Sequence, residues 1–152
     1  RNLLPVGGFR LMTGQVAERA ITEEDGMRAN LYGLLGSLLF VAPNTKILKS
    51  MQALSGDDTE MGQAFNTLAK LAGATDVPTA RAEYDGVLIG MGRGELLPSA
   101  SYYLTGFLNE KPLAKLRNSM KELGIARSDE VKEPEDHIGS LLEMMSGVIT
   151  SS

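Results

Sequence analysis

Hydrophobic residues recur three and four positions apart along most of the chain, which is the spacing of one face of an α-helix. Thr22 is a hydroxyl residue followed by the acids 23–25, and this order predicts a helix N-cap. The apolar face behind it consists of Met27, Leu31, Leu34, Leu35, Leu38 and Leu39. Pro43 should end this helix, and Asn44 should cap the next one.

The same spacing predicts four further helices. Their apolar faces are Ile47, Leu48, Met51 and Leu54; Met61, Phe65, Leu68, Ala69 and Ala72; Ala80, Tyr84, Val87 and Leu88; and Leu113, Leu116, Met120 and Leu123. Asp76 and Pro78 mark a helix start, and Gly124 marks a helix end. A charged linker is expected over 127–132. No segment alternates apolar and polar residues over the length of a strand, so the predicted fold class is all-α.

A last helix is predicted to start at Pro134, which has the acids Glu133, Glu135 and Asp136 around it. Its apolar face is Ile138, Leu141, Leu142 and Met145, and little sequence follows. Because a helix normally buries such a face, either the earlier helices cover it or C-terminal helices beyond residue 152 are missing.

The ends of the chain set the expected domain boundaries. Residues 1–21 are expected to be an N-terminal tail, flexible or not native, with Met12 as an alternative native start. Residues 22–152 are expected to form one helical-bundle domain, since 152 residues suffice for one core. The opening residues lack the apolar core of a signal peptide, and no apolar run reaches the length of a membrane span. We therefore expect a cytoplasmic protein with no stable membrane insertion.

Composition removes several classes of function. A net charge of −4 and a pI of about 5.0 leave no basic excess for nucleic acid. The absence of cysteine excludes disulfides, thiolate nucleophiles and cysteine-ligated zinc. His137 is the only histidine and stands beside its own acids, so neither a catalytic triad nor a metal site is indicated. A neutral residue at a capped helix start is the simpler interpretation.

An irregular stretch at residues 84–103 interrupts the helical pattern. It contains three alternating glycines, Gly90, Gly92 and Gly94, followed by Pro98. Glycine amides can cradle a phosphate, but no strand precedes them and no Gly-Lys-Ser/Thr follows, so a tightly turned loop is favoured over a nucleotide-binding module. Aromatic residues gather around this stretch, and they indicate either core packing or the wall of a peptide groove. They are Tyr84, Tyr102, Tyr103 and Phe107.

Two motifs, in this order, resemble the TorD/DmsD family of redox-enzyme maturation chaperones. In the first, over 90–102, a glycine-rich turn leads into a proline and a Ser-x-Tyr sequence. The second, over 133–138, reads Glu-Pro-Glu-Asp-His-Ile and is followed by an apolar helix. A Pro-Leu-x-x-Leu helix and a Leu-Gly stop separate them. The resemblance covers about residues 22–146.

The resemblance implies an all-helical cytoplasmic chaperone without catalytic activity. Such proteins bind the twin-arginine signal peptide, and sometimes the body, of a molybdenum-cofactor oxidoreductase precursor before its export. Some members form domain-swapped homodimers, and some bind GTP weakly; no other cofactor and no metal are implied. A nucleotide-binding helical module and a general helical interaction protein are the alternatives.

The resemblance also suggests where a peptide would bind. By motif match, the peptide-binding residues are Tyr102, Asp136 and His137, while Gly90, Gly92, Gly94 and Pro98 shape the loop. Tyr84 and Tyr103 would extend an apolar groove. Because carboxylates pair well with guanidinium groups, Glu133, Glu135 and Asp136 are expected to receive the two arginines, with Asp136 first.

Overall fold

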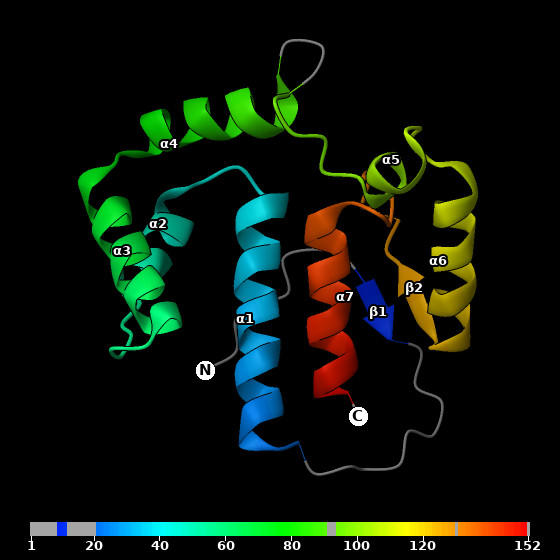
Figure 1. Cartoon of the computed structure of the whole chain (residues 1–152), viewed down its shortest axis with the longest axis horizontal. Coiled ribbons are helices and arrows are strands. Elements are labelled where there is room, and N and C mark those ends of the chain that lie inside the picture. Colours follow the sequence, from blue (N-terminus) through cyan, green and yellow to red (C-terminus); the bar gives the residue numbers. More distant parts are fainter. Residues whose placement is uncertain (1–8, 12–20, 91–93, 130, 152) are drawn as a thin grey trace. The chain divides into compact units, whose positions relative to one another are not determined.

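A computed structural model describes residues 9–11, 21–90, 94–129 and 131–151 (Figure 1). The elements in chain order are β1 Phe9–Leu11, α1 Glu23–Phe40, α2 Thr45–Gln52, α3 Glu60–Ala74, α4 Val77–Tyr84, the π-helix η1 Asp85–Ile89, α5 Ala100–Thr105, α6 Glu110–Glu122, β2 Ile125–Arg127 and α7 Ile138–Thr150. They form two compact units, one with α1, α5, α6, α7 and both strands, the other with residues 42–97. The predicted all-α class is confirmed, and the stretch treated as one helical domain contains both units.

The predicted helix starts are formed by side chains that accept hydrogen bonds from the first turn. Thr22 accepts from the backbone N–H of Asp25, and Asn44 accepts from two N–H groups of α2. Asp76 accepts from the N–H of Thr79. These bonds satisfy donors that have no partner within the helix itself, which explains why the starts could be read from the sequence.

In the first unit, α7 lies between α1 and the two strands, and α6 lies beyond the strands (Figure 1). The contact between α1 and α7 is built on Gly36 and Gly139. A Cβ placed on Gly139 would lie 2.6 Å from Cβ of Phe40 and 3.1 Å from the carbonyl oxygen of Gly36. Further along the same contact, Ser146 Oγ donates to the carbonyl of Ala29 at 2.8 Å. The two backbones therefore approach closely because neither glycine carries a side chain.

The other side of α7 faces the core of this unit. Met144 packs there with Met120 of α6 and Ile125 of β2. The partly buried residues around them are Phe9, Leu116, Leu141 and Val148. Of the four residues predicted to form the apolar face of the last helix, Ile138 and Met145 are instead exposed, by 38% and 46%. The earlier elements thus bury one side of this helix, centred on Met144 rather than on Met145.

Three local predictions were wrong. Residues 9–11 were set aside with the tail and Arg127 was assigned to a linker, yet β1 pairs antiparallel with β2 in the register Phe9↔Arg127 to Leu11↔Ile125. Three residues are too few for strand alternation to show. The last helix starts at Ile138, because Pro134 forms a turn in which its carbonyl accepts from the N–H of His137. The short helix α5 begins within the stretch 84–103, which was predicted to be irregular.

The second unit is a set of short helices tied together by side-chain amides and an arginine. Asn66 of α3 donates to the carbonyl of Gly56 and accepts from its N–H, at 3.1 and 2.9 Å. Gln52 Nε2 donates to the carbonyl of Ala72, and Arg81 Nε donates to that of Pro43, both at 2.9 Å. No helix in the described part of the chain is long and apolar enough to cross a membrane.

Candidate functional site

The two family-like motifs meet in the first unit at a contact that we call the motif junction, residues 98–101 and 135–138. Ser99 and His137 form an antiparallel bridge. On either side of it, the N–H of Ile138 donates to the carbonyl of Pro98 at 2.7 Å, and the N–H of Ala100 donates to that of Asp136 at 3.0 Å. Each motif thus completes the backbone hydrogen bonding of the other.

Asp136 is buried within the junction, with 2% of its surface exposed. Its Oδ2 accepts from the backbone N–H of Ser101 at 2.9 Å, while its Oδ1 is buried without a hydrogen-bond partner. Ser101 is itself fully buried, and its Oγ accepts from the N–H of Asn109 at 3.0 Å. The carboxylate expected to be the first peptide contact therefore binds the chain's own backbone.

His137 is the N-cap of α7. Its Nδ1 accepts from the N–H of Gly139 at 3.1 Å, and its ring stands edge-on to Phe40 with the centroids 5.2 Å apart. Burial lowers the pKa of His137, against the opposing charges of Glu133 and Asp136. Because Nδ1 is an acceptor, the imidazole is neutral and carries its proton on Nε2. This agrees with the interpretation of His137 as a neutral, capping residue.

Glu135 is held by an arginine of α6. Its Oε2 accepts from Nε and Nη2 of Arg117 at 3.1 and 2.8 Å, and Arg127 Nε lies 3.7 Å from Oε1. Burial acts to raise the pKa of Glu135, but these hydrogen bonds and charges hold the pKa below its ordinary value. Glu133 is exposed. Among the three predicted acids, Glu133 is thus the one presented to solvent.

No metal site accompanies these acids, since the described residues contain no cluster of three or more His, Cys, Asp or Glu that could hold an ion.

A run of exposed apolar residues follows the junction directly along the chain. We call it the α5 patch; it consists of Tyr103, Leu104, Phe107 and Leu108, which are 65%, 71%, 68% and 49% exposed. Tyr102 is half-buried, and its ring meets the ring of Tyr103 edge-on, with the centroids 5.6 Å apart. Sequence reasoning named both tyrosines and Phe107 but missed the two leucines, although Leu104, Phe107 and Leu108 already have helical spacing.

The predicted loop residues divide between the two units. Gly90 has φ 64° and its N–H donates to the carbonyl of Asp85, closing η1. A Cβ on Gly94 would lie 2.7 Å from backbone atoms of η1, so this position requires close approach. The N–H of Leu96 donates to the carbonyl of Val87 at 2.9 Å. Gly90 and Gly94 thus shape the backbone, and the N–H groups of Gly90 and Leu96 donate to carbonyls within the chain.

Two further residues were predicted to belong to the site, Tyr84 and Gly92. Tyr84 ends α4 in the 42–97 unit and is half-buried, whereas Pro98 belongs to the motif junction in the other unit. Gly92 lies outside the described residues.

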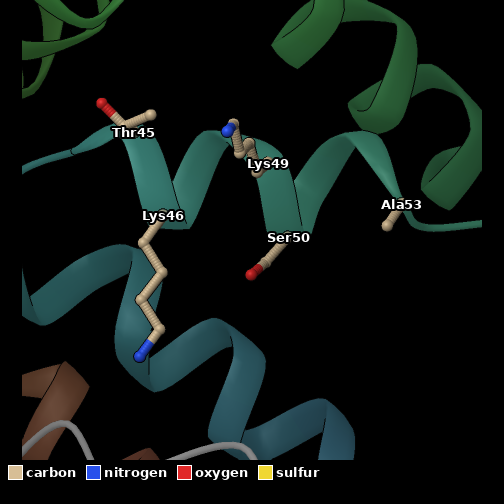
Figure 2. A pocket seen from close by; sticks show the side chains of 5 residues that line it. All are labelled: Thr45, Lys46, Lys49, Ser50 and Ala53. Carbon is tan, nitrogen blue, oxygen red and sulfur yellow. The ribbon is translucent and has the colours of Figure 1, made fainter.

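The 42–97 unit carries a surface pocket of about 530 Å³ on α2. Its lining residues are Thr45, Lys46, Lys49, Ser50 and Ala53 (Figure 2). The ammonium groups of the two lysines point in different directions, so they do not converge on one anion (Figure 2).

Comparison with known proteins supports one family. Residues 54–152 match the family described as nitrate reductase delta subunit. The chain is 37% identical to the chaperone protein TorD of Photobacterium profundum over 45% of this chain and 32% of that protein. It is 27% identical to TorD of Aliivibrio fischeri over 85% of this chain and 67% of that protein. The chain thus spans from about a third to two thirds of the length of these relatives.

The fold has a counterpart among solved structures. A crystal structure of a candidate redox enzyme maturation protein from Archaeoglobus fulgidus matches with a TM-score of 0.59 and 22% identity, over 80% of this chain and 70% of that one.

Proposed function

The chain belongs to the nitrate reductase delta subunit family, and on that premise we propose that it is a cytoplasmic maturation chaperone. Its client is the precursor of a molybdenum-cofactor oxidoreductase, and its ligand is the precursor's twin-arginine signal peptide. Relatives carrying the name chaperone protein TorD support a chaperone role without catalysis.

The observation that carries the peptide-binding part is the α5 patch. Large apolar residues gathered on one short surface segment are typical of a surface that binds a partner. The apolar stretch of a signal peptide, which follows its two arginines, is a ligand of matching chemistry. Tyr103 adds a polar group to an apolar surface, as binding surfaces often do.

The acidic residue best placed for an arginine of the peptide is Glu133. It is exposed, whereas Asp136 and Glu135 are buried and already hydrogen-bonded within the chain. A carboxylate and a guanidinium form a strong, frequently bidentate pair. In this arrangement Glu133 selects the arginines and the α5 patch binds the apolar stretch.

Titration calorimetry with a synthetic twin-arginine signal peptide tests the proposal. We expect Leu104→Ser and Phe107→Ser each to weaken binding roughly tenfold, because each removes a large apolar contact. Met27→Ser is the matched control, since Met27 is a comparably exposed apolar residue on α1. An absence of binding by the native chain at high micromolar concentration would disprove the proposed function. Equal affinity of both patch variants and the native chain would disprove the assignment of the patch.

A further inference from the structure

We infer that Asp136 is a positioning residue: it shapes the segment that carries the α5 patch, acting through Ser101 and Asn109, and does not itself contact the peptide. This inference rests on the proposed function, because it concerns how the same peptide-binding surface is held.

The first argument is that Asp136 caps α5 from a distant part of the chain. The N-cap residue of α5, Ser99, makes no side-chain cap hydrogen bond. Instead the first two N–H groups of the helix, those of Ala100 and Ser101, donate to the backbone oxygen and to Oδ2 of Asp136, at 3.0 and 2.9 Å. These N–H groups have no partner within the helix, and a negative charge is favourable at that end. Asp136 thus accepts the N-terminal hydrogen bonds of α5 that the side chain of Ser99 does not accept.

The second argument is that a hydrogen bond of Ser101 links the start of α5 to the turn that follows it. Ser101 Oγ accepts from the N–H of Asn109, 8 residues later, at 3.0 Å. Gly106 has φ 80° and Asn109 has φ 72°, and Asn109 is the one positive-φ residue other than glycine in the described part of the chain. A residue held in this conformation needs surrounding contacts that enforce it. All four patch residues lie between Ser101 and Asn109 in the chain.

The third argument is access. Asp136 is 2% exposed and Ser101 is fully buried, so the guanidinium of a peptide cannot reach the carboxylate while the junction is intact. The negative charge of Asp136 interacts with Arg117 within the protein. It helps to raise the pKa of Arg117, although Glu135 has the larger effect. The unpartnered Oδ1 is the atom through which a direct contact would have to form.

Substitution by asparagine separates the two roles. Asp136→Asn keeps an oxygen that can accept from the N–H of Ser101 but removes the charge, whereas Asp136→Ala removes both. Ser101→Ala leaves the carboxylate in place and removes only the acceptor for Asn109. Ser119→Ala, an exposed serine of α6, is the control for the serine substitution.

Affinities for the twin-arginine peptide, measured by calorimetry at low and high salt, provide the test. We expect Asp136→Ala and Ser101→Ala each to bind roughly tenfold more weakly, since fewer molecules present the patch in its binding conformation. Asp136→Asn should stay within about threefold of the native chain, with an unchanged salt dependence, because no charge pair with the peptide is lost. Ser119→Ala should match the native chain. Amide exchange at Asn109 should accelerate in Ser101→Ala and Asp136→Ala only.

The inference is overturned if Asp136→Asn loses as much affinity as Asp136→Ala and shows a reduced salt dependence, while Ser101→Ala binds like the native chain. That pattern would assign Asp136 to a direct contact with an arginine. If Asp136→Ala does not fold, the comparison of Asp136→Asn with Ser101→Ala decides alone. A native chain that binds no peptide disproves the proposed function before any variant is compared, so the two failures are distinguishable.

Discussion

Replacing Gly139 with alanine should destabilise the unit that carries the motif junction. The added Cβ would lie 2.6 Å from Cβ of Phe40 and 3.1 Å from both Cα of Phe40 and the carbonyl oxygen of Gly36. These atoms belong to or adjoin the backbone of α1, so they cannot rotate away as the end of a long side chain could. Overpacking of this kind costs up to about 3 kcal/mol, and alanine returns at most about 1 kcal/mol through its helix propensity. We therefore expect a net loss of about 2 kcal/mol.

Two glycines of α1, Gly26 and Gly36, provide variants of graded severity for comparison. At Gly26 nothing lies within 4 Å of an added Cβ, so Gly26→Ala should stabilise by about 0.5–1 kcal/mol. At Gly36 the nearest atoms lie at 3.1 and 3.3 Å, so Gly36→Ala should fall between the other two variants. Urea unfolding followed by far-UV circular dichroism gives the three free energies of unfolding. If Gly139→Ala proved as stable as Gly26→Ala, the close approach of α1 and α7 would be refuted.

Three further substitutions test ionisable groups of the unit that contains the motif junction, each by urea unfolding. Burial lowers the pKa of His137, so the stability contributed by its neutral form is complete above about pH 6.5 and is lost as the pH falls through the folded-state pKa. His137→Asn, which replaces the Nδ1 acceptor of the cap with an amide oxygen and does not titrate, should remove this dependence. Burial raises the pKa of Glu143 of α7 to about 7, so stability is lost as the pH rises through about 7. Glu143→Gln should therefore raise the free energy of unfolding at about pH 8 by on the order of 1–2 kcal/mol, a value reduced because Glu143 is only partly buried. Arg117→Met leaves the carboxylate of Glu135 buried without its main partner and should lower the free energy of unfolding by about 1–2 kcal/mol. The loss is smaller than for a fully buried pair because Arg117 is half-exposed. Lys115→Met changes an exposed lysine of the same helix and should leave the stability nearly unchanged. A flat pH profile for the native chain, or equal effects of the two methionine variants, would contradict these assignments.

The features that could be read from the sequence are those whose partners lie within a few residues. Thr22, Asn44 and Asp76 cap helices by binding N–H groups two or three positions ahead, so residue type and spacing are sufficient. The single histidine was recognised as part of a capped helix start for the same reason, since Nδ1 binds an N–H two residues later. The predicted start of that helix was wrong, because the proline forms a turn before it.

The features that could not be read are those in which one group has a distant partner. Glu135 and Arg117 are 18 residues apart, and Ser101 and Asp136 are 35 residues apart. Nothing local distinguishes a carboxylate that will be buried against such a partner from one that will face solvent. The sequence therefore grouped Glu133, Glu135 and Asp136 as candidates for binding arginine, with Asp136 first, whereas in the structure each has a different environment.

The different contacts of these residues explain why the order of residues in the motif 133–138 matters. Glu135 anchors the segment to α6 through Arg117, Asp136 caps α5, and His137 caps α7 and contacts Phe40. Three successive positions thus cap α5 and α7 and anchor the segment to α6, and among the three predicted acids only Glu133 remains exposed. A substitution at Asp136 or His137 would then impair peptide binding even if neither residue touched the peptide. Loss of binding alone cannot identify a contact here; the comparison of asparagine with alanine at Asp136 can, because it separates the charge from the hydrogen bond that holds α5.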